Sequence, residues 1–537
     1  MLIIKSKRKR ALGLNEPLKH ESHKRPVTRR DFLAQGFTTG AATVVVPAAM
    51  SMLTPRRASA LTGDLETIDR ERCGLFGGNG KIPFICFDLA GGANIAGSNV
   101  LVGQQGGQMD FLSTQGYAKQ GLPGNMLPNN STTNFVNTEF GLAFHSDSAF
   151  LRGMLEKTTP ATRAMVNGAV IAARSENDTS NNPHNPMYGI AKAGPLGQGA
   201  KGELLTLIGS QNSESGGNSM APAAMIDPAN RPTKIDRVSD VTGLVDTGEV
   251  ASILSVSDTV QTLETMYKIT GRKLALVDTR LGAGVGPDGD GGDAAVKKQF
   301  QCAYLKTADT VETFSNPASL NPSLDTRVQA LFGGANFSGD GEFQKTASVM
   351  KLVIDGNAGA GTISMGGFDY HTGERATGEA RDLRAGRCIG ACLEYAALER
   401  KPVMIYVFSD GSLSSNGMID DSVGGRGKGQ WTGDNQQTAA SFFLVYNPNG
   451  RPTLIGEGTA AAARHQQIGY YSANGDVVTS SSPAANNVNL LVQTVILNYM
   501  ALHGEQGSFN DLFGNALGTG ASLDGMIAFN QIVNGTV

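Results

Sequence analysis

A carboxylate and an imidazole stand two positions apart near the middle of the chain, in the stretch SMGGFDYHT at residues 364–372. Side chains two residues apart in an extended segment point to the same face, so Asp369 and His371 can reach one ion or one substrate. Zinc accepts carboxylate together with imidazole, and hard divalent cations need several oxygen ligands. The pair therefore indicates either the rim of a metal site or the polar end of a buried strand.

Two more carboxylates follow this pair along the chain. Asp410 ends the apolar run PVMIYVFSD, about one long helix after the first pair, and Asp434 lies in WTGDNQQ further on. We predict a divalent-metal site, for zinc, calcium, magnesium or manganese, with the ligands Asp369, His371, Asp410 and Asp434. The alternative is that these residues only complete turns and cap helices, as Asp often does, and that no metal is bound.

A glycine-rich loop, AGGANIAGSN, follows the run IPFICFDL. It lacks the Lys-Ser/Thr pair of a phosphate-binding loop and the glycine spacing of a dinucleotide fingerprint, so an oxidoreductase that uses a dinucleotide is a distant alternative. Its glycines allow the backbone to approach a ligand closely. We predict Asn94 or Ser98 near the reacting oxygen, with the Ser98 hydroxyl as the nearest nucleophile. Four further residues are candidates for the same pocket: Asp88, His184, Ser409 and Asn435.

Apolar stretches followed at once by polar loops recur along the chain. Examples are IPFICFDL, GAVIAAR, LLTLIGS, GTISMGGFD and PVMIYVFSD. Such continuous apolar runs are typical of strands buried on both faces of a parallel sheet. Because ligands collect outside the carboxyl ends of the strands in open α/β sheets, we expect the loops that follow these runs to converge.

Helical periodicity lies between the strand candidates. The segments SVSDTVQTLETMYKIT, FQKTASVMKLVID, GERATGEARDLRAGRCIGACLEYAALER and NNVNLLVQTVILNYMALHG space apolar residues three to four apart. In the last segment, Asn486 or Asn487 is a suitable N-cap. Alternating strands and helices predict an α/β fold. Residues 190–345 show weaker periodicity, and we predict an insertion or cap there.

The N-terminus has the pattern of an export signal. Arg29 and Arg30 precede Asp-Phe-Leu, an uncharged stretch follows, and Ala-Ser-Ala ends at Ala60. This resembles a twin-arginine signal with cleavage after Ala60, which predicts a periplasmic or secreted protein. The alternative is a retained anchor, but the apolar stretch contains Gly and Pro and is short for a membrane span. We predict no stable span after cleavage.

The predicted cleavage changes the charge of the protein. Residues 1–60 carry twelve Lys and Arg against three Asp and Glu, and removing this net +9 from the chain's −3 leaves −12 for residues 61–537. An acidic mature protein argues against nucleic-acid binding. Five cysteines remain, an odd number that does not predict a disulfide framework.

Taken in order, these motifs resemble a family of exported bacterial proteins. The twin-arginine signal, FDLAGGAN, LAFHSDSAF, GGFDYH, VFSDGS and GDN are similar to those of the domain-of-unknown-function family DUF1501, which is related to the alkaline phosphatases and sulfatases. The resemblance covers most of residues 61–537 and is weakest at 190–345. It implies an alkaline-phosphatase-like three-layer sandwich, a mostly parallel sheet with helices on both faces.

The chain departs from the family at several motif positions. An acid is expected where Asn94 stands, an arginine is expected after the Asp410 motif, and a histidine is expected where Asn435 stands. The resemblance implies a metal-dependent hydrolase of phosphate or sulfate esters. The departures keep open a second reading, a cell-envelope protein that binds a glycan or protein partner, or serves secretion or assembly, without catalysis.

Overall fold

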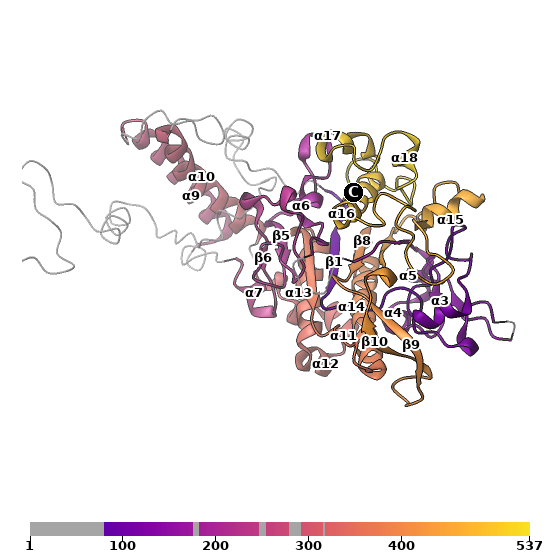
Figure 1. The fold of residues 1–537 in the computed structure, drawn as a ribbon. Helices are drawn as coiled ribbons and strands as arrows, with labels where there is room; N and C mark the ends of the chain where they lie inside the picture. The colour runs from indigo at the N-terminus through magenta and orange to yellow at the C-terminus, as the bar shows by residue number, and fades with distance from the viewer. Residues whose placement is uncertain (1–79, 131, 176–181, 246–253, 279–291, 315–316) are drawn as a thin grey trace, which may run out of the picture. The chain divides into compact units, whose positions relative to one another are not determined.

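The computed structural model describes residues 80–130, 132–175, 182–245, 254–278, 292–314 and 317–537 (Figure 1). The predicted signal segment, with Arg29, Arg30 and the cleavage site after Ala60, lies outside these ranges. The chain forms two compact units. Among the described residues, one unit contains 254–278 and 292–314, and the other contains 80–130, 132–175, 182–245 and 317–537.

The larger unit is built on an eight-stranded sheet with the order β12-β4-β11-β8-β1-β7-β5-β6. Every strand runs parallel to its neighbours except β11, which is antiparallel to β8 and β4. The predicted α/β fold with a mostly parallel sheet is confirmed. The strands are β1 (Phe84–Leu89), β4 (Val166–Ile171), β5 (Leu205–Gly209), β6 (Thr233–Lys234), β7 (Ala358–Met365), β8 (Val403–Phe408), β11 (Ser441–Tyr446) and β12 (Gln467–Ile468).

One face of the sheet is covered by α6 (Met187–Lys192) and α16 (Val488–Leu502), whose apolar residues form a single core with strand side chains. The ring of Phe84 on β1 meets the ring of Tyr499 edge-on at 5.7 Å, a favoured aromatic geometry. Helix α16 begins after Asn487, whose side chain accepts a hydrogen bond from the third helical N–H, as an N-cap does.

The opposite face is covered by α4 (Ala149–Lys157), α13 (Gly341–Ile354) and α14 (Arg375–Glu399). Side chains alternate between the faces of a strand. Phe442 of β11 therefore points away from the first core, and its ring lies 6.2 Å from that of Phe150 on α4. Helices thus cover both faces of the sheet.

Two small hairpins and several short helices complete the larger unit. These elements are β2 (Val136–Asn137), β3 (Phe144–His145), β9 (Leu413–Asp420), β10 (Lys428–Asp434), α3 (Thr114–Lys119), α5 (Pro160–Ala164), α7 (Val238–Thr242), α11 (Thr326–Phe332), α12 (Gly334–Gly339), α15 (Ala460–Gln466), α17 (Phe509–Phe513) and α18 (Ala521–Asp524).

None of the helices in the described ranges combines the length and apolarity needed to span a membrane.

Residues 190–345, where an insertion or cap was predicted, include strands β5 and β6 of the main sheet. They also include the start of helix α13, which covers one face of that sheet. The separate unit contains the paired helices α9 (Val256–Leu274) and α10 (Gly292–Thr313).

The cysteines also differ from expectation. Cys302 is disulfide-bonded, whereas Cys86, Cys388 and Cys392 are free and buried. The odd number of cysteines did not predict the disulfide at Cys302.

Candidate metal centre and adjoining cavity

The loops after three central strands leave the sheet at one edge. Strand β1 pairs in parallel with both β7 and β8, and Asp88 of β1 lies in register with Ser364 on one side and Phe408 on the other. Because all three strands run in the same direction, the segments that follow them start side by side at the carboxyl edge of the sheet.

Backbone contacts lock these three loops together. Gly91 N donates a hydrogen bond to Asp410 Oδ1 at 2.9 Å, and Ala93 N donates to Ser409 Oγ at 2.8 Å. Gly91 has a φ of +117°, and a Cβ at this position would lie 2.8 Å from the backbone nitrogen of Asp369. The close approach of the first loop to the Asp369 loop therefore requires glycine.

Three of the four predicted metal ligands come together at this edge. One ligand atom from each of Asp369, His371 and Asp434 lies within 4.8 Å of the others. Nδ1 of His371 lies 2.5 Å from Asp369 Oδ1 and 3.1 Å from Asp434 Oδ1. The two carboxylates are about half exposed, at 55% and 50%, and the imidazole is 29% exposed. The site is therefore open to solvent and to a substrate.

The three side chains fit a divalent cation. His371 Nδ1 is shielded from solvent and lies close to both carboxylates, yet it forms no hydrogen bond of acceptable geometry among the described residues. A divalent cation bound between His371 Nδ1 and the two carboxylate oxygens would supply the partner that Nδ1 lacks. Two carboxylates and an imidazole suit zinc or manganese, and three protein ligands leave positions for water or a substrate oxygen.

Asp410 does not join this group, contrary to the prediction. It is 1% exposed, and its Oδ1 accepts the Gly91 N–H. Asp88 is also enclosed: its carboxylate accepts hydrogen bonds from Asn218 N at 2.7 Å, Ser219 N at 2.8 Å and Ser219 Oγ at 2.9 Å. Burial raises the pKa of Asp88 to about 6, and the negative charge of Asp410 adds to the rise. Both carboxylates are buried and accept hydrogen bonds from backbone N–H groups of neighbouring loops.

Asn94 and Ser98 lie in a buried network instead of at the exposed cluster. Ser98 is fully buried, and its Oγ accepts hydrogen bonds from Asn94 Nδ2 at 2.5 Å and Arg375 Nη2 at 3.1 Å. A hydroxyl that is enclosed and hydrogen-bonded in this way stabilises the first loop, and in this structure it is not presented to a substrate.

Tyr370 stands between the two candidate ligands of its loop, Asp369 and His371, and points inward. Its hydroxyl donates to Asp382 Oδ1 at 2.8 Å and accepts from Asn94 N at 3.2 Å. Asp382 Oδ2 accepts a second hydrogen bond from Asn99 Nδ2 at 2.7 Å. The alternation of side chains along the extended segment thus exposes Asp369 and His371 while Tyr370 fastens the loop to the interior.

His184 is buried beneath the strand ends. Its ring stacks on Phe408 of β8 with the centroids 6.1 Å apart and the planes at 5°. Burial lowers the pKa of His184 to about 4, so the imidazole is neutral near pH 7. This geometry gives His184 a packing role in the core below the edge.

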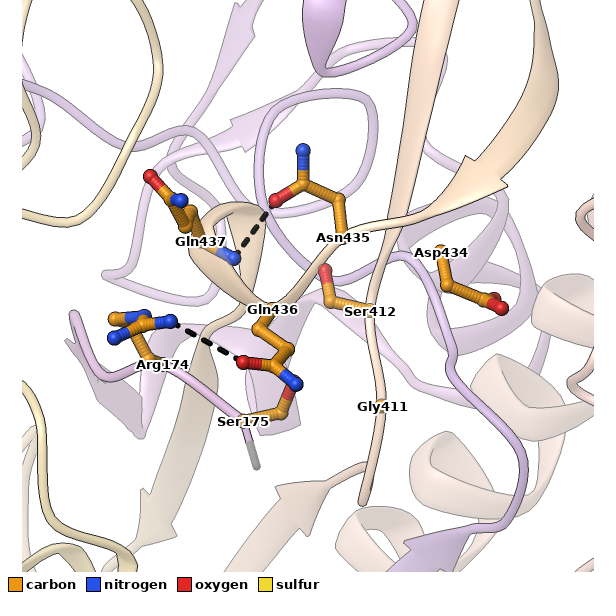
Figure 2. A pocket seen from close by; sticks show the side chains of 8 residues that line it. All are labelled: Arg174, Ser175, Gly411, Ser412, Asp434, Asn435, Gln436 and Gln437. Carbon is orange, nitrogen blue, oxygen red and sulfur yellow. Dashed lines mark hydrogen bonds between the residues drawn. The ribbon is translucent and has the colours of Figure 1, made fainter. Parts of the chain in front are cut away.

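A cavity of about 360 Å³ shares Asp434 with the candidate metal centre, and Figure 2 shows the residues that line the cavity. Of the residues predicted for the pocket, Asn435 lines this cavity. Arg174 also lines it and was missed, although it ends the run GAVIAAR and could have been found by the rule that singled out the acids after the other strands. The lining residues are Arg174, Ser175, Gly411, Ser412, Asp434, Asn435, Gln436 and Gln437.

Comparison with known proteins adds no identity: no family model, no curated protein and no solved structure matches the chain. The geometry of the site is therefore the basis for any functional conclusion.

Proposed function

We propose that this protein is an exported, divalent-metal-dependent hydrolase of phosphate or sulfate esters, with an alkaline-phosphatase-like arrangement of its α/β sheet. The observation that carries the proposal is the convergence of Asp369, His371 and Asp434 within 4.8 Å at the carboxyl edge of the sheet. The cavity that borders this cluster offers a place for the ester.

The donor set explains why hydrolysis is the best-supported reaction. A divalent ion with free coordination positions polarises an ester oxygen and lowers the pKa of bound water. The exposed carboxylates leave such positions accessible to a substrate. Because Ser98 is buried, water is a better candidate nucleophile than this hydroxyl.

Metal content and turnover test the proposal together. The purified protein is expected to contain close to one equivalent of a divalent metal, measured by elemental analysis, and to release 4-nitrophenol from 4-nitrophenyl phosphate or 4-nitrophenyl sulfate. Asp434→Asn should lose both properties, whereas Asp511→Asn, at an exposed position of α17, should keep both. Wild-type protein that binds none of zinc, manganese, magnesium or calcium and cleaves neither ester would refute the proposal.

A second function is favoured by one observation, the burial of both predicted reacting groups, Asn94 and Ser98. A cell-envelope protein that binds a glycan or protein without cleaving it needs no presented nucleophile. In that case Asp369→Ala should retain the co-purifying partner and wild type should show no turnover. Turnover that disappears in Asp369→Ala would instead support the hydrolase.

Export is a separate part of the proposal. Replacing Arg29 and Arg30 together with lysine should retain the protein in the cytoplasm, as detected by fractionation of the native host. Unchanged export of this double variant would contradict the twin-arginine route.

A further inference from the structure

The cavity beside the candidate metal centre contains one cationic side chain among its described lining residues, that of Arg174. Arg174 Nη1 donates a hydrogen bond to Asn486 Oδ1 at 2.7 Å, and Nη2 donates to Gln436 Oε1 at 3.2 Å. Both partners are neutral amides, and no carboxylate of the described residues forms an ion pair with Arg174. The amides orient the guanidinium and leave its charge available to an anion. A guanidinium presents a planar set of donors that matches phosphate and similar oxyanions.

Ser175, the next residue along the chain, supplies a second unsatisfied polar group. It is 4% exposed, and its Oγ has no hydrogen-bond partner among the described residues. A buried hydroxyl without a partner is costly, so its satisfaction by a ligand or by water is favourable. Arg174 and Ser175 therefore place an available charge and an unpaired hydroxyl in the same wall of the cavity.

Apart from Gly411, the other described residues of the wall carry polar side chains. Figure 2 shows the Gln436 side chain reaching the Arg174 guanidinium, whereas the carboxylate of Asp434, which also lines the cavity, points away from Arg174. No aliphatic or aromatic side chain is among the described residues that line the cavity. Side-chain amides both donate and accept hydrogen bonds, which matches the hydroxyls of a sugar or polyol. An aromatic or lipid substituent would leave these groups unpaired.

We infer that the cavity recognises a small, hydrophilic, anionic ligand, namely a phosphate or sulfate ester of a sugar or polyol, with Arg174 as the residue that binds its anionic group. The volume of about 360 Å³ lies near the lower end of the range of about 300 to 1,000 Å³ for ligand cavities, which suits a small ligand such as a monosaccharide ester. As a statement about the substrate, this inference rests on the proposed hydrolase function, but binding to the cavity can be measured without turnover.

Calorimetry with glucose 6-phosphate and glucose 6-sulfate tests the inference on the full protein. At least one of the two should bind wild type, and Arg174→Gln should weaken binding by about tenfold or more, because a charge-assisted hydrogen bond is lost. Arg174→Lys should restore part of the affinity, and Gln437→Leu should weaken binding of both esters. Arg464→Gln, on the exposed surface of α15, is the matched control and should bind as wild type does.

The outcomes separate this inference from the proposed function. If wild type binds neither glucose ester, or if Arg174→Gln binds them unchanged, the inference is wrong even where the protein contains metal and cleaves 4-nitrophenyl esters. Tighter binding of 4-nitrophenyl phosphate than of glucose 6-phosphate would also overturn it. Binding that depends on Arg174 in a protein without metal or turnover would leave the cavity assignment standing and refute only the hydrolase.

Discussion

The pH dependence of stability should be governed strongly by one buried carboxyl, Asp382 on α14. It is 3% exposed, and its two oxygens accept hydrogen bonds from the Tyr370 hydroxyl and the Asn99 side chain. Burial raises the pKa of Asp382 from 3.8 to about 7, against the opposing effect of these hydrogen bonds. The folded protein thus holds a proton on Asp382 that the unfolded chain releases near pH 4.

The sign of the effect follows from this difference in pKa. The contribution of Asp382 to the free energy of unfolding is complete below about pH 4 and is lost as the pH rises through about 7. A shift of about three pKa units corresponds to about 4 kcal/mol over that range. Asp382→Asn cannot ionise, so the variant should lack this share of the pH dependence.

Urea unfolding of the metal-free protein at pH 5, 6, 7 and 8 measures the effect. The free energy of unfolding of wild type should fall more steeply with pH than that of Asp382→Asn, and the difference between the two curves isolates this residue from Asp88, whose raised pKa both proteins share. Asp511→Asn, an exposed substitution, should follow wild type. Parallel curves for wild type and Asp382→Asn would show that Asp382 is ionised in the folded protein and would refute the reasoning.

Three further substitutions test the site and its support. His371→Ala should lower the zinc affinity measured by calorimetry by roughly 100-fold or more, because residues that only orient ligands typically contribute 10–100-fold. Unchanged affinity would exclude His371 as a ligand. Gly91→Ala should lower the free energy of unfolding by about 1–3 kcal/mol because of its positive φ, whereas Gly124→Ala, with open space at its Cβ, should change it little. Glu379→Gln removes a carboxylate that pairs with two buried cations, Arg375 and Lys428, and should lower the free energy of unfolding by about 3–5 kcal/mol. Glu156→Gln breaks a more exposed pair with Arg387 and should lower it by less than about 1 kcal/mol. Equal losses for the two variants would contradict the role of burial.

Much of the fold could be predicted because strands buried on both faces leave a strong pattern. The runs around β1, β4, β5, β7 and β8 are continuous apolar segments, and all of these strands are fully buried. Strand β11 was not predicted, although SFFLVY is equally apolar. The direction of β11 relative to β4 and β8 is set by the path of the connection that precedes it, and amino-acid composition does not reveal that path.

The candidate site was predicted in part for a similar reason. The alternation of side chains correctly placed Asp369 and His371 on one face, and Asp434 joined them. Asp410 did not, because the direction of a side chain at a strand end is set by contacts with other loops, here by the N–H of Gly91. Arg174 was missed because the predicted site contained acids, a histidine, amides and hydroxyls but no cationic side chain.

Asn94 helps to hold the loop that carries Asp369 and His371 in place. The backbone N–H of Asn94 donates to the hydroxyl of Tyr370, and its side chain donates to Ser98. The first loop therefore acts on the cluster through the residue that lies between Asp369 and His371. Loops that carry exposed ligands bind metal tightly only if something else holds them in place, since each free rotor adds an entropic cost on binding. Tyr370→Phe removes the hydrogen bonds of the Tyr370 hydroxyl to Asn94 and Asp382 and leaves every candidate ligand intact. This variant should therefore bind zinc about 10–100-fold more weakly. Unchanged affinity would mean that the ligand loop is held by its backbone alone.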